Sequence, residues 1–135
     1  MAHRLPIAFT SRIQAPESNF RDFELETEVG RITVRGHLST GSRGWRLRAE
    51  AARRRSVITV QVTAIETEPE RLPDLEHHEY EAVIDVGSPG RFNVRVAHSF
   101  LLREVGGQGM PRPVFEESAA VPPPPPTPSA APPRA

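Results

Sequence analysis

The sequence predicts an all-β fold, an antiparallel β-sandwich of six to eight strands followed by a disordered proline-rich tail. Apolar and polar residues alternate with a period of two in several separate segments, which is the pattern of half-buried strands. Gly, Pro and Ser interrupt these segments at intervals of about ten residues, as they do in sandwich folds. Ten of the 15 prolines lie in residues 111–135, where no apolar alternation accompanies them. Such a segment favours extended, solvated polyproline conformations.

The chain divides into three predicted parts. Residues 1–19 form an N-terminal arm or edge strand, because Pro6 interrupts the apolar run at residues 5–9 and cannot donate a hydrogen bond to a sheet. Residues 20–105 form the sandwich domain, and residues 106–135 form a Gly- and Pro-rich tail. The sandwich part is long enough for one hydrophobic core of modest size.

The first strands of the sandwich are expected between residues 23 and 38. Residues 23–28 alternate Phe and Leu with acidic residues. Glu and Leu also favour helices, but the alternation continues into the next run and favours a strand. In residues 31–38 the pattern is clear, with Ile32 and Val34 on the same face as Gly36. A glycine on the inner face of a strand indicates that a bulky neighbour approaches closely there.

Two further strands are joined by a basic turn. Residues 45–51 begin with Trp45, the only tryptophan, which we expect to anchor the core because it is the largest apolar side chain. Residues 57–65 are rich in β-branched side chains and give the strongest strand signal in the chain. The intervening residues 53–55 are all arginine and predict a charged hairpin turn.

The longest alternating stretch, residues 80–98, predicts a β-hairpin. Apolar residues recur at every second position on both sides of a tight turn at residues 88–90. The preceding residues 66–79 are acidic, contain two prolines and show no period. We expect them to form the crossover between the two sheets, although loops of this length are often functional.

Several of these features together resemble a known architecture. The order of Trp45, the β-branched run at residues 57–65 and the string PGRFNVRV at residues 89–96 is similar to that of bacterial immunoglobulin-like and fibronectin-like modules. The resemblance covers roughly residues 23–98, and it lacks the inter-sheet cysteine pair of antibody domains. It implies a β-sandwich with a binding or structural role, and it brings no catalytic residues and no cofactor.

The composition argues against several classes of function. Seventeen basic and 17 acidic residues give a formal net charge of zero, which argues against nucleic acid or an anionic membrane as the partner. The absence of cysteine excludes disulfides, thiolate catalysis and Cys-based zinc sites. No run approaches the roughly 18 apolar residues of a membrane span. Residues 1–13 are too polar for a signal peptide, which favours a cytoplasmic location.

His77, His78 and Glu79 form the densest group of potential metal ligands. Imidazole and carboxylate groups bind zinc, copper or nickel, and His37 or His98 could join the set. Adjacent residues of a strand point to opposite faces, so a shared metal requires this segment to be a loop. A solvated loop without a metal is the alternative.

No catalytic arrangement is expected. Ser99 follows His98, and Asp85 lies nearby in the predicted hairpin, which suggests a hydrolytic triad at first sight. However, adjacent residues of one strand face opposite ways, and the nucleophile motif G-x-S-x-G is absent. The sequence therefore predicts a protein without enzymatic activity.

Charged residues near the start of the sandwich allow two interpretations. The acidic positions either bind calcium or a basic partner, or pair with arginines across neighbouring strands, which stabilises a sheet modestly. We expect pairing. The acidic residues are Asp22, Glu24, Glu26 and Glu28, and the candidate arginines are Arg31, Arg35, Arg46 and Arg48.

Two segments are candidates for binding a partner. Arg53, Arg54 and Arg55 could bind phosphate at a loop tip, or could simply form a charged turn that prevents edge-to-edge aggregation. Pro122 and Pro125 belong to a run of prolines that could dock in an aromatic-lined groove. A semi-rigid spacer is the alternative for that run.

The sequence as a whole predicts a non-enzymatic module that binds another protein or assembles with itself. The absence of a catalytic constellation and the alternating strands favour this interpretation. The alternative is a β-sandwich that binds a metal or small ligand through His77, His78 and the acidic segment at residues 66–79.

Overall fold

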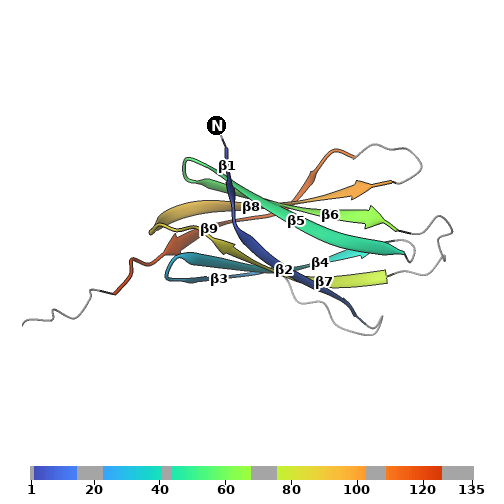
Figure 1. The fold of residues 1–135 in the computed structure, drawn as a ribbon, viewed down its shortest axis with the longest axis horizontal. Helices are drawn as coiled ribbons and strands as arrows, with labels where there is room; N and C mark the ends of the chain where they lie inside the picture. The colour runs from blue at the N-terminus through green and yellow to red at the C-terminus, as the bar shows by residue number, and fades with distance from the viewer. Residues whose placement is uncertain (1, 15–22, 41–43, 68–75, 103–108, 126–135) are drawn as a thin grey trace, which may run out of the picture.

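The computed structural model describes residues 2–14, 23–40, 44–67, 76–102 and 109–125. In this part the chain forms nine β-strands in two sheets packed face to face (Figure 1). The predicted all-β sandwich is confirmed, with one strand more than expected. The strands are β1 (His3–Leu5), β2 (Ile7–Gln14), β3 (Glu24–Glu28), β4 (Arg31–Thr40), β5 (Trp45–Arg54), β6 (Val57–Glu66), β7 (Glu76–Asp85), β8 (Gly90–Leu101) and β9 (Arg112–Val121). The described residues include no helix that could span a membrane.

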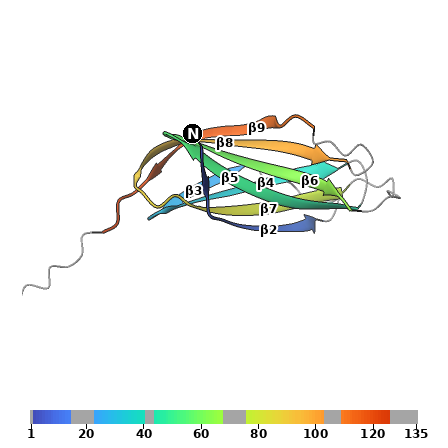
Figure 2. The same ribbon diagram turned by 45° about the horizontal axis from the view of Figure 1, so that its top comes forward.

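The larger sheet has the strand order β1-β5-β6-β8-β9, and the smaller sheet has the order β2-β7-β4-β3 (Figure 2). Neighbouring strands pair antiparallel, except that β6 and β8 run parallel, with Val57 opposite Asn93. The prediction of a purely antiparallel sandwich is wrong at this pair. A parallel pair needs a long crossover, and the chain provides it by passing through β7 of the other sheet.

The hairpin predicted at residues 80–98 does not form. β7 belongs to the smaller sheet and β8 to the larger one, so the chain between Asp85 and Gly90 crosses from one sheet to the other. The backbone N–H of Val86 donates to the carbonyl oxygen of Gly30 at 2.9 Å, which fixes the start of this crossing against the turn between β3 and β4. The alternating pattern suits both arrangements, because an apolar strand face can be buried by either sheet.

The crossover predicted at residues 66–79 does connect the two sheets. β6 ends at Glu66 in the larger sheet, and β7 begins at Glu76 in the smaller sheet. The prediction of a loop is wrong for residues 76–79, which belong to β7 and pair with both β2 and β4. The intervening residues 68–75 lie outside the described part of the chain.

The N-terminal segment, for which the sequence predicts an arm or one edge strand, contributes an edge strand to each sheet. β1 pairs with β5, β2 pairs with β7, and Pro6 lies between them. Proline has no N–H to continue a ladder, and the chain leaves one sheet and enters the other at this residue. The segment thereby links the two sheets along one side of the sandwich.

The C-terminal region is more ordered than the prediction of a tail from residue 106 allowed. β9 pairs antiparallel with β8, and its residues Ala119 and Val121 are buried in the core. The sequence prediction failed here because Pro113 and two glutamates obscure the alternation. Proline is tolerated because β9 is an edge strand. The rest of the predicted tail, residues 126–135, lies outside the described part.

The core consists of inward-facing residues from both sheets, and β-branched side chains dominate it. Trp45 is only partly buried at the end of the sandwich, where it packs edge-on against Phe100 with ring centroids 5.8 Å apart. The expected anchor is therefore peripheral. The large side chains with almost no exposure are Ile32, Val34, Ile58, Val60, Val62, Tyr80, Ile84, Val94 and Val96.

Candidate functional site

A hollow of about 540 Å³ opens at the side of the sandwich where the edge strands β3 and β9 face each other. β3 begins at Glu24, which pairs with Arg35, so residues 36–40 of β4 extend beyond it and border the hollow. β8 and β9 border it from the larger sheet. The residues that line it are Phe23, His37, Leu38, Ser39, His98, Phe100, Met110, Arg112 and Val114.

A buried polar pair lies beside this hollow. The hydroxyl of Tyr80 on β7 and Nε2 of His98 on β8 are 2.7 Å apart and form a hydrogen bond across the interior. Both side chains are buried, with relative exposures of 2% and 8%. Burial raises the pKa of Tyr80 above its usual value. Burial, and to a smaller extent the nearby His37, lowers the pKa of His98 to about 4.

An aromatic side chain from the smaller sheet closes the inner end of the hollow. Phe23 stacks on Phe115 of β9 with ring centroids 5.2 Å apart, and it also contacts His98 at 6.0 Å. The ring lies directly over Gly36, where a Cβ atom would collide with it. The close approach predicted at Gly36 is therefore confirmed. The packing joins the edges of both sheets.

The mouth of the hollow exposes apolar side chains and one cation. Met110 is 92% exposed and Phe100 is 40% exposed, which is high for large hydrophobic residues. Arg112 pairs with His98 in the β8–β9 register and also lines the hollow. Within the described part of the chain, no hydrogen bond or ion pair involves the guanidinium of Arg112.

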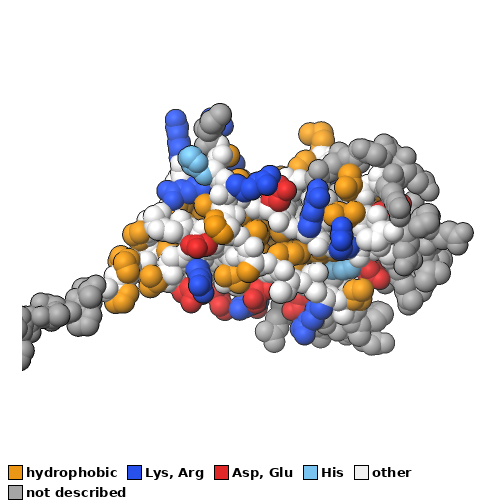
Figure 3. Space-filling model, viewed as in Figure 1, with side chains coloured by type: hydrophobic (Ala, Val, Ile, Leu, Met, Phe, Trp, Pro, Cys, Tyr) orange, Lys and Arg blue, Asp and Glu red, His pale blue; other side chains and the backbone are white. Residues whose placement is uncertain are grey.

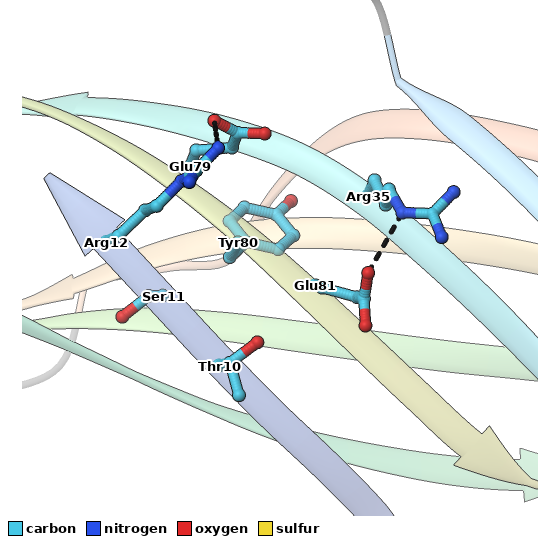
Figure 4. A pocket seen from close by; sticks show the side chains of 7 residues that line it. All are labelled: Thr10, Ser11, Arg12, Arg35, Glu79, Tyr80 and Glu81. Atoms are coloured by element: carbon cyan, nitrogen blue, oxygen red, sulfur yellow. Dashed lines mark hydrogen bonds and ion pairs between the residues drawn. The ribbon is translucent and has the colours of Figure 1, made fainter. Parts of the chain in front are cut away.

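The outer face of the smaller sheet carries a network of ion pairs around a shallower hollow of about 390 Å³ (Figure 4). Arg35 contacts Glu26 at 2.9 Å, Glu81 at 2.9 Å and Glu24 at 3.7 Å. The carboxylates of Glu26 and Glu81 raise the pKa of Arg35. The cross-strand pairing expected for the acidic residues of β3 is confirmed for Arg35. The arginines of β5, Arg46 and Arg48, lie in the other sheet.

The outer face of the larger sheet is basic. In Figure 3, blue side chains lie over the upper part of the molecule, where β5 runs in Figure 1, and most red ones gather along the lower edge near β3. Arg95 contacts Glu116 at 3.0 Å, and Arg4 contacts Glu50 at 3.8 Å. Among the described residues, four more arginines of this face have a guanidinium without a hydrogen bond or ion pair. These are Arg46, Arg48, Arg54 and Arg91.

The predicted metal ligands His77, His78 and Glu79 lie on β7 and are divided between its two faces. His78 is buried, and its Nε2 lies 3.0 Å from a carboxylate oxygen of Glu76. Nδ1 of His77 lies 2.7 Å from the hydroxyl of Ser39, and Glu79 pairs with Arg12 at 3.3 Å. In the described ranges, no group of three or more His, Cys, Asp or Glu side chains could hold a metal ion.

The predicted partner-binding arginines have different surroundings. Arg53 donates hydrogen bonds to the carbonyl oxygen of Arg55 and to the hydroxyl of Ser88, each at 2.8 Å, and its guanidinium lies 4.7 Å from the ring centre of Phe92. These contacts give Arg53 a structural role in the turn. Arg54 and Arg55 are exposed.

The predicted docking prolines lie beyond the last described strand, and within the described ranges they pair with no strand. Pro122 and Pro125 are exposed and follow directly after β9. The structure places them at the end of the larger sheet and away from its core, which is compatible with both the docking and the spacer interpretations.

The structure separates the residues of the apparent hydrolytic triad. His98 faces the core and bonds Tyr80, whereas the hydroxyl of Ser99 lies 3.0 Å from that of Thr63 on the neighbouring strand. The sequence pattern does not predict the hollow or the position of Arg112 at its mouth. The only available signal was an arginine flanked by apolar residues, and its position depends on the unexpected strand β9.

No family model, curated protein or solved structure matches the chain. The function of the hollow and of the two charged faces therefore has to be inferred from their geometry and chemistry.

Proposed function

We propose that the chain is a non-enzymatic β-sandwich module that assembles with itself. In this proposal, the basic outer face of the larger sheet docks on the acidic outer face of the smaller sheet of a second copy. The observation that carries the proposal is the opposite charge of two faces in a chain whose formal net charge is zero.

The charges are assigned to the faces from the pairing register and from the alternation of buried and exposed residues. The larger sheet presents six arginines and two glutamates, and the smaller sheet presents six acidic residues and three arginines. On the larger sheet these are Arg4, Arg46, Arg48, Arg54, Arg91 and Arg95, with Glu50 and Glu116. On the smaller sheet they are Glu24, Glu26, Glu28, Glu79, Glu81 and Asp85, with Arg12, Arg31 and Arg35.

The size of the faces is adequate for a weak specific interface. The strands of the smaller sheet have 8, 10, 10 and 5 residues, and at about 3.4 Å per residue and about 4.8 Å between strands they give a geometric face of roughly 540 Å². Two copies would then bury roughly 1,100 Å² in total, which falls in the range of weak or transient interfaces. Because the contact is mainly electrostatic, we expect it to weaken at high salt.

The arrangement also determines the kind of assembly. A contact between two different faces is heterologous, and it leaves one acidic and one basic face open at the ends. Such contacts extend into open chains unless the rotation between copies closes a ring. The expected products are therefore a series of oligomers, and their average size should rise with protein concentration.

The resemblance to immunoglobulin-like modules remains a prediction about architecture. The two packed sheets of about ten-residue strands support it. The parallel pair of β6 and β8 distinguishes this chain from a sandwich built from antiparallel sheets. The proposed binding role therefore depends on the two faces and not on the resemblance.

Two charge-reversal variants test the proposal by sedimentation velocity at two salt concentrations. Surface charges are weakly screened at about 20 mM salt and strongly screened at about 0.5 M salt. The first variant combines Arg46→Glu with Arg48→Glu and removes the net positive charge of the larger sheet, which then presents four arginines and four glutamates. The second combines Glu26→Lys with Glu28→Lys and gives the smaller sheet a small net positive charge, with five cations against four carboxylates. The matched control, Arg46→Lys with Arg48→Lys, keeps the charge of the larger sheet.

The wild-type chain and the lysine control should associate at low salt, and each reversed variant alone should sediment as a monomer. An equimolar mixture of the two variants should associate again, because each now offers a face complementary to the other. Association that persists in the first variant, or a mixture that stays monomeric while the wild-type chain associates, would contradict the proposed contact. A wild-type chain that is monomeric at low salt would contradict self-assembly itself.

A further inference from the structure

We propose that the hollow between the edges of the two sheets binds a small organic carboxylate with an apolar body, and that Arg112 binds the carboxylate. The apolar body would lie between the aromatic side chains that line the hollow. This site is separate from the two charged faces of the proposed assembly, so either proposal can fail without the other.

The shape and lining of the hollow are those of a small-molecule site. Its volume of about 540 Å³ lies within the range of roughly 300–1,000 Å³ that is typical of ligand pockets. Ligand sites are lined mainly by apolar side chains with a few polar groups that fix orientation. The apolar residues here are Phe23, Leu38, Phe100, Met110 and Val114, and the polar ones are His37, Ser39, His98 and Arg112.

The exposed apolar surface at the mouth supports an apolar ligand body. Met110 and Phe100 are among the few large hydrophobic side chains that the described part of the chain leaves exposed. Both border the same hollow, so a ligand inside it would remove their surface from water. Removing apolar surface from water is the main source of affinity in such sites.

Arg112 supports the choice of a carboxylate. Among the described lining residues it is the one with a permanent charge, and within the described chain its guanidinium has no hydrogen-bond or ion-pair partner. A guanidinium presents a planar fork of donors that matches a carboxylate with two parallel hydrogen bonds. The register places Arg112 beside His98, at the boundary between the buried floor and the solvent.

His98 makes the floor of the hollow neutral at physiological pH. The ring is buried, its Nε2 is already bonded to the hydroxyl of Tyr80, and its pKa is about 4. A neutral floor suits an apolar ligand end, and the guanidinium of Arg112 at the mouth suits an anionic end. The hollow therefore favours a molecule that has one apolar end and one anionic end.

Decanoate and decanol are suitable probes because they differ only in the charged end. Isothermal titration calorimetry of the full chain with each probe measures the two affinities, below the concentration at which the probes aggregate. Trp45 provides an independent signal from inside the protein, because it is the only tryptophan and its ring contacts Phe100 at the mouth. Decanoate that occupies the hollow should change the emission of Trp45 over the same concentration range as the heat.

We expect saturable binding of decanoate, at least about tenfold tighter than that of decanol, because a charge-assisted hydrogen bond is lost with the alcohol. Arg112→Gln should reduce the affinity for decanoate to that for decanol. Arg55→Gln, which removes an exposed arginine from the turn between β5 and β6 and from neither proposed interface, should leave both affinities unchanged. Circular dichroism of both variants checks that they are folded.

Three results would overturn the proposal. These are the absence of saturable decanoate binding, equal affinity for decanoate and decanol in the wild-type chain, and decanoate affinity that survives Arg112→Gln. Heat without a change in Trp45 emission would place the probe elsewhere and would overturn it as well.

Discussion

Replacing Gly36 by alanine should destabilise the fold although it adds a single methyl group. A Cβ atom at this position would lie 2.6 Å from the hydroxyl oxygen of Tyr80 and 2.7 Å from Cδ1 of Phe23, and it would be closer still to Cε1 of that ring. Contacts below 3.0 Å require something to move. Both candidates are constrained, because Phe23 stacks on Phe115 and the hydroxyl of Tyr80 bonds His98.

The expected cost combines three effects. Overpacking a filled core costs about 1–3 kcal/mol. Displacing the Tyr80 hydroxyl from His98 leaves buried polar atoms unsatisfied, which costs about 1–3 kcal/mol more. Alanine also lowers the conformational entropy of the unfolded chain, and this stabilises the folded state by about 0.4–1 kcal/mol. The central values give a net loss of about 3 kcal/mol in the free energy of unfolding.

Urea unfolding followed by Trp45 fluorescence and circular dichroism measures this loss. Gly109→Ala is a matched control, because a Cβ atom at Gly109 would lie 3.6 Å from the carbonyl oxygen of Phe100, at an ordinary contact distance. Combining Gly36→Ala with Tyr80→Phe should cost less than the sum of the two single changes, since the hydroxyl that obstructs the methyl group is gone. A Gly36→Ala variant as stable as the wild-type chain would refute the packing described around Phe23.

Two further predictions concern the buried pair of Tyr80 and His98. Tyr80→Phe should lower the free energy of unfolding by about 1–3 kcal/mol, because His98 Nε2 then has no partner in a buried position; an unchanged urea midpoint would argue against this hydrogen bond. The second prediction concerns pH. The pKa of His98 is about 4 in the folded chain and 6.5 in the unfolded chain, so the unfolded state binds the proton first as pH falls. The contribution of His98 to stability should be fully present above pH 6.5 and should be lost progressively towards pH 4. At about 1.36 kcal/mol per pKa unit, the loss from His98 amounts to up to about 3 kcal/mol. His98→Gln should show a shallower decline in thermal unfolding temperature over this range, whereas an identical pH profile in both proteins would contradict the assignment.

Inner and outer faces of most strands could be predicted from the sequence, because burial follows the two-residue period directly. Ile32, Val34 and the apolar residues of β6 lie on the predicted inner face and are fully buried. The close approach at Gly36 was also predictable, since a glycine at an inward position leaves space that another side chain fills. β9 was not predictable, because its pairing depends on the exposed edge of β8 and its own alternation is weak.

The candidate site was less predictable than the fold, because its residues are brought together by sheet order and not by spacing along the chain. His98 lies on β8, and Arg112 lies on the neighbouring edge strand β9, whose sequence predicts a tail. The metal-binding interpretation of His77 and His78 depended on a loop. Both residues lie on strand β7, where adjacent side chains point to opposite faces of the sheet.

The error at residues 80–98 shows what local periodicity leaves undetermined. In a hairpin centred on Pro89, Tyr80 and His98 would be directly opposite on neighbouring strands about 4.8 Å apart, whereas here they meet across two sheets that pack about 10 Å apart. Four residues separate Asp85 from Gly90, and they can reach about 16 Å when extended, so the connection is long enough for both arrangements. Both also bury the same residues and bring the same pair together. The larger separation is bridged only because tyrosine and histidine have long side chains with polar ends that bond in the middle of the core, at 2.7 Å. A shorter pair at these two positions could have met in a hairpin but not across the sandwich, so the length of these two side chains, which periodicity does not reflect, is what permits the observed hydrogen bond between the sheets.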